Sequence, residues 1–527
     1  MRVFNAKSLS WSIVVSAWLV IAYSRPLLSA LEQYQAGALL QLKIGLLLWL
    51  FYAAFLSLSR ALGCFKVVAI ALIMIAAPVS FFMQQYGVVI DPDMLVNTIE
   101  TDIGETADLL SLALFQHLFL LGVLPSILIW KFDSSTTRWS TQLGQGVLAS
   151  TLLVAVMSTM MYTNYDDFAS LFRNHRDIKY RIVPFNAISS TVSVIKQHFD
   201  VPTEFVTLGT DAVQRKSMSK PKVMVVIVGE TARADHFSVN GYARLTTPKL
   251  NRLAASGQIL SYTNAISCGT ATAISVPCMF SFATAETYND TVRSSSNVLD
   301  VLKQAGISAT WIENNSGCKN VCDRIETTVL DQQGCAELEC FDNDMVTRLS
   351  ALLQETERDR VIVLHQMGSH GPAYYKRSPQ SLKQFQPECE SADLTACSKE
   401  QIINAYDNSL LVTDALISGV IELLQTRTDI DASMMYVSDH GESLGDHGIY
   451  LHGLPNWMAP AEQRQIPWIV WPTSHFKNMT VDNHQPVSHD YLAHTLLGFF
   501  EVETALYDHQ LDLIDSTGSV NIAHTTP

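Results

Sequence analysis

Apolar residues are concentrated in the first 162 residues, where they form five stretches long enough to cross roughly 30 Å of membrane hydrocarbon. The stretches run near Ser8 to Ser24, Ala36 to Ser59, Val67 to Met83, Leu109 to Trp130 and Leu143 to Tyr162. The first also has the length of a signal peptide, but no small-residue cleavage pattern follows it and four more stretches do, so we expect it to be retained. The pattern predicts a five-helix transmembrane domain over residues 1–162.

A different pattern begins at residue 223, where short continuous apolar runs alternate with helical patterns. The runs are "KVMVVIVGE", "ISATWIE", "VIVLHQMG", "SMMYVSDHG" and "PWIVWP", and helical patterns cover Thr247 to Ser256, Ser296 to Gln304 and Gln401 to Leu424. Continuous apolar runs are typical of buried parallel strands, so this alternation predicts an α/β domain over residues 223–527. Residues 163–222 are mixed and include the basic patch "FRNHRDIKYR", which predicts an amphipathic bridging segment near anionic headgroups.

Charges in the short loops predict the orientation of the five stretches. One side carries Arg2, Lys7, Arg60, Lys66, Lys131 and Arg138, whereas the other carries Arg25 and the acidic run from Asp91 to Asp108. Because basic loops stay in the cytoplasm, the amino terminus is predicted to be cytoplasmic. Five crossings then deliver everything after Tyr162 to the other side. Lys43, inside the second stretch, is an exception that either snorkels to the outer interface or faces a cavity.

Composition agrees with a membrane protein. Of the 527 residues, 48% are hydrophobic and only 16% are charged, and the mean hydropathy is positive. These values are unusual for a wholly soluble protein.

The cysteines test this orientation independently. Only Cys64 lies in the membrane portion; the exported portion holds Cys268, Cys278, Cys318, Cys322, Cys335, Cys340, Cys389 and Cys397. An even number in an oxidising compartment indicates disulfides, and we predict pairing within the four sequence-close couples. The alternative is a zinc cluster at Cys318 and Cys322, but no compact second Cys/His pair accompanies them.

Candidate site residues follow the predicted strands. Glu230, His365, Asp439 and His440 all stand at strand ends, and the carboxyl ends of parallel strands meet at one edge of a sheet. An adjacent Asp and His supply the oxygen and nitrogen ligands that suit Zn²⁺. The alternatives are structural: Glu230 caps a helix, and Asp439 caps the helix that follows Asp439 in the sequence.

"SCGTATAISVPC", from Ser267 to Cys278, places hydroxyl residues between two cysteines. A threonine hydroxyl becomes a good nucleophile only when a metal or base removes its proton. A helix starting near Thr272 would direct free N–H groups at a phosphate, and Gly269 would let the backbone approach it. Taken alone, the stretch is typical of an ordinary helix start.

Several long motifs in this order resemble one family. "VGETARADHFSVNGY", "SCGTATAISVPCMFS", "LHQMGSHGPAY", "NAYDNSLL", "YVSDHGESLG" and "YLHGLP" look like the phosphoethanolamine transferases that modify lipid A, including the mobile colistin resistance proteins. The resemblance spans nearly the whole chain. It implies a five-span membrane domain followed by a periplasmic α/β/α domain of the alkaline-phosphatase and sulfatase type. It also implies one zinc ion, with room for a second.

The resemblance carries roles to single positions. Thr272 matches the nucleophile and a zinc ligand, and Glu230, Asp439 and His440 match the remaining ligands. Two histidines near the phosphoryl group or a second metal match His370 and His452, and a substrate-side lysine matches Lys319. The headgroup residues match Asn97, Thr101 and Glu105, which share one face if that segment is helical. Otherwise "NTIETDIGE" is a solvated acidic loop.

The implied reaction is ping-pong transfer of phosphoethanolamine from phosphatidylethanolamine to a lipid A phosphate by a monomer in the inner membrane, with polymyxin resistance as its phenotype. Core sugars of lipopolysaccharide are the alternative acceptor, and no nucleic acid partner is expected. One departure from the family pattern is Asp446-His447-Gly448, where His447 either adds a metal ligand or is exposed.

Three other functions remain to be weighed. A sulfatase needs Cys or Ser in a C-x-P-x-R pattern, whereas Cys268 precedes Gly-Thr-Ala-Thr. A glycerol-phosphate transferase of the lipoteichoic acid type would leave Glu105 without a cationic partner. A non-enzymatic sensor of cationic peptides would not need the metal and nucleophile residues.

Overall fold

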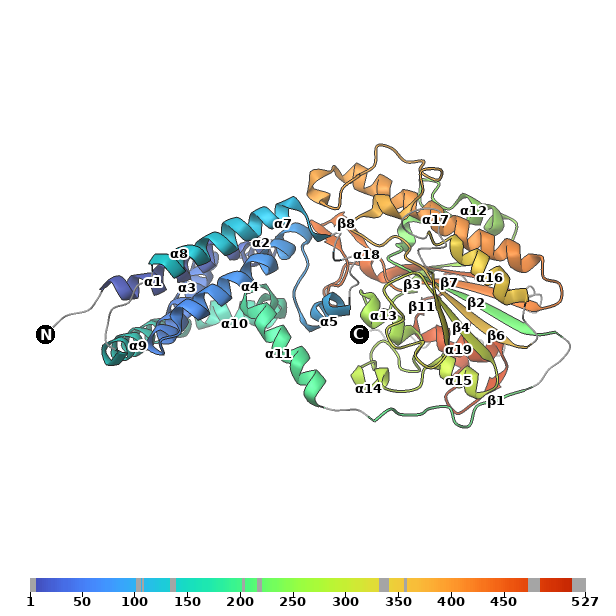
Figure 1. Cartoon of the computed structure of the whole chain (residues 1–527), viewed down its shortest axis with the longest axis horizontal. Coiled ribbons are helices and arrows are strands. Elements are labelled where there is room, and N and C mark those ends of the chain that lie inside the picture. The colour runs from blue at the N-terminus through green and yellow to red at the C-terminus, as the bar shows by residue number, and fades with distance from the viewer. Residues whose placement is uncertain are drawn as a thin grey trace. The chain divides into compact units, whose positions relative to one another are not determined.

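The computed structural model describes residues 6–100, 106, 109–132, 139–200, 204–215, 220–330, 341–354, 358–472 and 484–513. The chain divides into two compact units (Figure 1). Residues 1–95 and 110–200 form the first, and residues 96–109 and 201–527 form the second.

The first unit is helical. Its helices are α1 (Ala6–Tyr23), α2 (Arg25–Gln33), α3 (Ala38–Ala61), α4 (Phe65–Tyr86), α7 (Leu112–His117), the π-helix η1 (Leu118–Val123), α8 (Leu124–Phe132), α9 (Trp139–Thr163), α10 (Tyr165–Asn174), the 3₁₀ helix η2 (Arg176–Arg181) and α11 (Phe185–Asp200), and α5 (Pro92–Glu100) runs into the second unit. Among the described residues, four helical stretches are long and apolar enough to cross a membrane, and the pair α1–α2, bent by 53°, makes a fifth if it is one span. The predicted transmembrane class is confirmed.

Lys43, the charged residue inside the second apolar stretch, lies near the start of α3 and forms an ion pair there. Its ammonium lies 2.7 Å from a carboxylate oxygen of Asp167 on α10. Asp167 follows the last span, so the pair lies at the side of the membrane that the chain enters after α9 (Trp139–Thr163). The structure therefore supports snorkelling rather than a buried cavity.

The second unit is built on a mixed β-sheet. Its strands are β2 (Lys222–Gly229), β3 (Leu260–Ile266), β4 (Ser308–Glu313), β5 (Glu326–Val329), β6 (Arg360–His365), β7 (Asp431–Ser438), β10 (Gln465–Trp471) and β11 (Val487–Ser488). Among the described residues their order across the sheet is β11-β3-β10-β7-β2-β6-β4-β5. Strands β7, β2, β6, β4 and β5 are parallel. The continuous apolar runs predict this for β7, β2, β6 and β4, whereas β5 is a short polar strand that the sequence pattern did not indicate.

One strand differs from the expected parallel sheet. The run "PWIVWP" forms β10, which is antiparallel to both β7 and β3. A continuous apolar run shows that a strand is buried on both faces, but it does not show the direction of the chain.

Helices cover both faces of this sheet (Figure 1). One face holds α13 (Thr272–Met279), α15 (Val298–Gln304) and α19 (Asp490–Phe499), which share a core with β2. The other holds α12 (Pro248–Ala255), α16 (Asp344–Gln354) and α17 (Lys399–Gln425). This three-layer α/β/α arrangement confirms the predicted class and leaves the carboxyl ends of the parallel strands as the edge where a site forms.

The disulfides follow the predicted local pairing. Cys268 is bonded to Cys278, Cys318 to Cys322 and Cys389 to Cys397. Among the described residues Cys64 is the free cysteine, and the predicted Cys335–Cys340 pair lies outside the described residues. Because the sulfurs of Cys318 and Cys322 are bonded to each other, the alternative zinc cluster there is wrong.

Candidate active site

Two neighbouring parallel strands place the acidic and histidine residues of the site. Strand β2 ends at Gly229 opposite Ser438, the last residue of β7. Glu230 therefore emerges beside Asp439, and His440 follows directly. All three side chains are fully buried.

Thr272 joins this group from a third element as the first residue of α13. Its hydroxyl donates to Oε2 of Glu230 at 3.0 Å and lies 3.4 Å from Nε2 of His440. That His440 nitrogen lies 3.4 Å from Oε1 of Glu230 and 3.3 Å from Oδ2 of Asp439. One hydroxyl, two carboxylates and one imidazole therefore share a single buried centre.

These groups fit a cation. Ligand atoms of Glu230, Asp439 and His440 all lie within 4.8 Å of one another. Oδ1 of Asp439 accepts from the backbone N–H groups of Thr231 and His440, whereas its Oδ2 is buried with no hydrogen-bond partner in the described part of the chain. His440 donates from Nδ1 to the Gly441 carbonyl at 2.8 Å, so Nε2 presents its lone pair to the centre. Two oxygen ligands and one nitrogen ligand are a donor set that suits Zn²⁺.

The electrostatics of the centre also favour a bound cation. Burial, followed by the Glu230 carboxylate, raises the pKa of Asp439 well above its ordinary value. Burial also raises the pKa of Glu230, but His440 and the neighbouring histidines outweigh it and hold the pKa below its ordinary value. Two buried carboxylates cannot both ionise cheaply without a positive charge between them.

The alternative helix-capping roles are not what the structure shows. After Asp439 the chain forms the hairpin of β8 (Ser443–Asp446) and β9 (Ile449–Leu451), so no helix follows for it to cap. Oε1 of Glu230 accepts from the Thr231 hydroxyl at 2.5 Å, and Oε2 accepts from Thr272.

His370 and His452, the two predicted phosphoryl-side histidines, lie against the centre. The ring of His452 is 4.3 Å from that of His440 between centroids, and the His370 ring is 5.5 Å from His452. Nδ1 of His452 lies 3.5 Å from Glu442, whose pKa is raised to about 8, chiefly by burial. His365, also expected here, is buried and lies 3.0 Å from Glu313.

The predicted substrate-side residues are placed only in part. Lys319 donates to the carbonyls of Ser316 at 2.9 Å and Glu100 at 3.1 Å, and Arg293 forms an ion pair with the Glu100 carboxylate at 2.7 Å. Asn97 lies on α5, which ends at Glu100. Thr101 and Glu105 lie outside the described residues, so the shared helical face stays a prediction.

The threonine loop, Ser267 to Ala271, is held on both sides. Thr270 donates its hydroxyl to the Leu454 carbonyl at 2.5 Å, which directs it away from the centre. At Gly269, a Cβ atom would lie 2.9 Å from Cγ2 of Ile274, so close packing against α13 requires glycine. The bond from Cys268 to Cys278 joins this loop to the end of α13 and leaves no cysteine thiol for sulfatase chemistry.

The departure from the family pattern has a structural explanation. His447 is exposed, so it is not a ligand of this centre. Asp446 accepts from Arg233 at 2.6 Å and from Lys399 at 3.1 Å. Through Arg233, Asp446 links the β8–β9 hairpin to the loop after Glu230. His452 directly follows this hairpin.

Sequence reasoning missed two residues that fix the centre. Asn315 donates its amide to Oε2 of Glu230 at 2.8 Å and to the Gln366 carbonyl at 2.9 Å. His489 accepts from the Cys268 N–H at 3.1 Å and donates to the Ser438 carbonyl at 2.9 Å. Asn315 stands two residues after the end of β4 and its position was a usable signal, whereas nothing near His489 in the sequence marks it.

His489 should stabilise the site as well as the fold. Replacing it with alanine leaves two buried backbone groups unpaired, so we expect the free energy of unfolding to fall by about 2–4 kcal/mol. Transfer per folded molecule should fall too, because the threonine loop loses its tie to β7. Pulse proteolysis in urea measures the first effect and a transfer assay the second.

His494→Ala is the matched control. His494 lies on α19, the helix that begins directly after His489, and its Nδ1 accepts from the Asp508 N–H at 3.1 Å rather than from the threonine loop. It should destabilise the domain but leave transfer per folded molecule unchanged. Equal losses of transfer in both variants would contradict the role of His489.

Low pH should destabilise the folded domain through protonation of His489. Burial lowers the pKa of His489 to about 4. The unfolded chain therefore binds a proton between about pH 6.5 and pH 4 that the folded chain does not, and stability falls as the pH falls through this window.

Comparisons with known proteins agree with this geometry. A family model described as Sulfatase matches residues 222–502, and one described as Phosphoethanolamine transferase EptA/EptB matches residues 46–199. The chain is 37% identical over 491 residues to phosphoethanolamine transferase EptA of Escherichia coli, covering 89% of this chain and 87% of that protein. It is 38% identical to phosphatidylethanolamine transferase Mcr-1 of Escherichia coli, covering 83% of this chain and 84% of that one.

The same similarity appears in three dimensions. The solved structure of the integral membrane protein lipooligosaccharide phosphoethanolamine transferase A from Neisseria meningitidis matches with a TM-score of 0.88 and 31% identity. The match covers 95% of this chain and 98% of that one, so both units are included.

Proposed function

The chain belongs to the EptA/EptB phosphoethanolamine transferase family, and from that premise we propose that it transfers phosphoethanolamine from phosphatidylethanolamine to a lipid A phosphate through a covalent intermediate on Thr272. The observation that carries the proposal is the Thr272 hydroxyl, placed 3.0 Å from Glu230 in a buried group with Asp439 and His440. A hydroxyl buried in such a group is suited to phosphoryl transfer.

The chain is an inner-membrane protein whose catalytic domain is in the periplasm. Its spans hold the second unit on the side of the membrane where the lipid A headgroup is displayed. The membrane also supplies the donor lipid, so donor and acceptor reach the site by lateral diffusion.

In the first half-reaction, the Thr272 oxygen attacks the phosphorus of the donor. A bond forms between Oγ1 and phosphorus, and the bond from phosphorus to the diacylglycerol oxygen breaks. The hydroxyl proton leaves along its hydrogen bond toward Oε2 of Glu230. His452, whose ring lies beside that of His440, or His370, whose ring lies beside that of His452, protonates the departing diacylglycerol oxygen.

In the second half-reaction, an oxygen of a lipid A phosphate attacks the same phosphorus. The bond from Oγ1 to phosphorus breaks, and Thr272 takes its proton back from Oε2 of Glu230. The histidine that protonated diacylglycerol takes up the proton of the attacking phosphate oxygen, which closes the cycle. A zinc ion held by Glu230, Asp439, His440 and Thr272 would lower the pKa of the hydroxyl and offset charge on the phosphoryl oxygens. Asn315 and Thr231 hold the Glu230 carboxylate in place by donating to its two oxygens.

The product explains the proposed phenotype. Each transferred group adds an ammonium to the lipid surface and so reduces the negative charge that attracts cationic peptides. Resistance to polymyxins, including colistin, is therefore the expected outcome in cells.

Mass spectrometry of lipopolysaccharide tests the proposal. Lipid A from cells that express the chain should gain the mass of phosphoethanolamine, and lipid A from cells with Thr272→Ala should not. A gain confined to core fragments would replace lipid A with core sugars as the acceptor. No gain in either fraction would contradict the proposed function.

Glu105 should bind the ammonium of the donor. Glu105→Gln should lower transfer roughly ten- to hundredfold, because a hydrogen bond to a charged group contributes on the order of 1.5–3 kcal/mol. Zinc content should not change. Transfer from phosphatidylethanolamine in vesicles, measured with zinc analysis of the same sample, checks both expectations.

Asp93→Asn is the control, since Asp93 is an exposed residue of the same acidic run. If both variants transfer at the wild-type rate, the segment is a solvated acidic loop and the headgroup role is wrong.

A further inference from the structure

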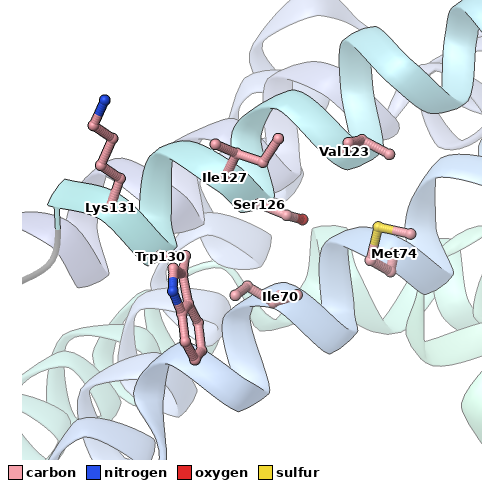
Figure 2. Close-up of a pocket in the computed structure, with 7 residues that line it drawn as sticks. All are labelled: Ile70, Met74, Val123, Ser126, Ile127, Trp130 and Lys131. Atoms are coloured by element: carbon pink, nitrogen blue, oxygen red, sulfur yellow. The ribbon is translucent and has the colours of Figure 1, made fainter.

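An apolar groove runs between α4 and α8 in the first unit. Its volume is about 620 Å³, and its walls are Ile70 and Met74 on α4 and Val123, Ser126, Ile127 and Trp130 on the η1–α8 segment (Figure 2). Lys131 extends outward beside Trp130 at one end. Ligand pockets of roughly 300–1,000 Å³ hold molecules of drug size, so the groove has room for an acyl chain.

The groove opens toward lipid rather than toward protein. Met74, Ile127 and Trp130 line it and are 43%, 52% and 65% exposed. Because these helices span the membrane, the exposed area faces hydrocarbon. Apolar lining alone would admit any lipid tail.

The position of the groove along the span identifies the leaflet. Helix α4 begins at Phe65, and α8 ends at Phe132. Lys66 in the first turn of α4 and Lys131 in the last turn of α8 mark the cytoplasmic ends of these helices, while the catalytic domain is periplasmic. The groove therefore lies in the cytoplasmic leaflet, on the opposite side from the donor lipid that the site consumes.

Positive charge is gathered at the same end of the groove. The Lys66 ammonium donates to the Trp130 carbonyl at 3.0 Å and lies 5.4 Å from the centre of the Trp130 ring. Lys131 is the next residue on α8 and lines the groove. No acidic side chain is among the seven residues that line it.

We propose that this groove is a binding site for an anionic glycerophospholipid of the cytoplasmic leaflet. One acyl chain lies along Ile70, Met74 and Ile127, and the lipid phosphate lies between the ammonium groups of Lys66 and Lys131. The Trp130 indole sits at the headgroup level, where tryptophan is enriched. Phosphatidylethanolamine is disfavoured because its own ammonium would lie beside the two lysines.

Fluorescence quenching by brominated lipids tests the site in the full-length protein. The purified chain is reconstituted in vesicles in which either phosphatidylglycerol or phosphatidylethanolamine carries bromine on its acyl chains. We expect brominated phosphatidylglycerol to quench tryptophan emission more strongly at equal mole fraction. Trp130→Phe should remove that excess.

Trp139→Phe is the matched control. Trp139 starts α9 at the cytoplasmic end of its span and is 66% exposed, almost the same as Trp130, but it does not line the groove. The excess quenching should persist in this variant. Equal quenching by the two lipids, or an excess that disappears with Trp139 instead, would overturn the proposal.

The lysines provide a second and independent readout. Lys66→Gln and Lys131→Gln should each lower the preference for phosphatidylglycerol about fivefold, since a lysine near an anionic surface contributes about 1 kcal/mol. Lys179→Gln, at an exposed lysine of η2 far along the chain, should not change it. Met74→Phe should fill the groove and displace the lipid with the lysines intact. If retention of phosphatidylglycerol in native mass spectrometry is the same in all these variants, the groove holds no specific lipid.

Discussion

Transfer and polymyxin resistance should both vanish in the Thr272→Ala variant. The Thr272 hydroxyl, at the start of α13, donates to Oε2 of Glu230. Alanine has no side-chain oxygen that could form the covalent intermediate. Losing a catalytic nucleophile typically lowers the rate by at least about a thousandfold. Zinc content should fall less than in Asp439→Asn, because the charged and imidazole ligands Glu230, Asp439 and His440 remain, and the melting temperature should stay near the wild type. Intact-protein mass spectrometry after incubation with phosphatidylethanolamine should show the adduct on the wild type and not on the variant.

Two further variants make this result specific. Thr272→Ser keeps the hydroxyl but loses the methyl group that restricts χ1, so it should retain part of the activity. Thr270→Ala should remain active, because the Thr270 hydroxyl is bonded to the Leu454 carbonyl and not to the centre. An adduct on Thr270, or full activity in Thr272→Ala, would show that the nucleophile has been misassigned.

Asp439→Asn should abolish both zinc binding and transfer. Its Oδ2 faces the centre and is buried with no hydrogen-bond partner among the described residues, which is the position of a ligand atom. An amide of the same shape carries no charge, so we expect zinc affinity to fall by more than the ten- to hundredfold typical of losing a residue that supports a ligand. Metal analysis after dialysis, together with the transfer rate at saturating zinc, measures the two losses.

Asp235→Asn is the control for this substitution. Asp235 pairs with Arg233 at 2.7 Å and is 55% exposed. The substitution therefore removes one negative charge from a neighbouring loop and leaves the centre unchanged. It should leave the zinc content unchanged. An Asp439→Asn protein that keeps its zinc after dialysis would show that this carboxylate is not a ligand.

The parts of the fold that could be predicted from sequence are those that depend on local burial. Strands β2 and β7 are buried along nearly their whole length, so their apolar runs have no polar interruption. Glu230 is the first residue after β2 and Asp439 is the first residue after β7, and parallel neighbours bring such residues together. The position of Thr272 at the start of α13 was also predictable, because the hydroxyl residues precede an apolar helical pattern.

The parts that could not be predicted depend on contacts between distant segments. The direction of β10 is fixed by its pairing with β3 and β7, which its own residues do not encode. His489 reaches the Ser438 carbonyl across 51 residues of sequence, and a lone histidine at the start of a helix resembles many others. Gly269 was interpreted as making room for a phosphate, whereas the structure gives Ile274 as the neighbour that requires it.

The separation of the site residues along the chain has a consequence for biosynthesis. Thr272 and His440 are 168 residues apart, so the proposed nucleophile enters the periplasm long before the proposed ligand that completes its centre. At a synthesis rate of about 5–20 residues per second, roughly 10–30 s pass between the two. During that interval β2 has no β7 beside it, whereas the Cys268–Cys278 link, which closes over 10 residues, needs nothing from later segments. We therefore expect a chain whose synthesis stops before residue 440 to be inactive, because its threonine lacks Asp439 or His440 and cannot react with membrane lipid during export.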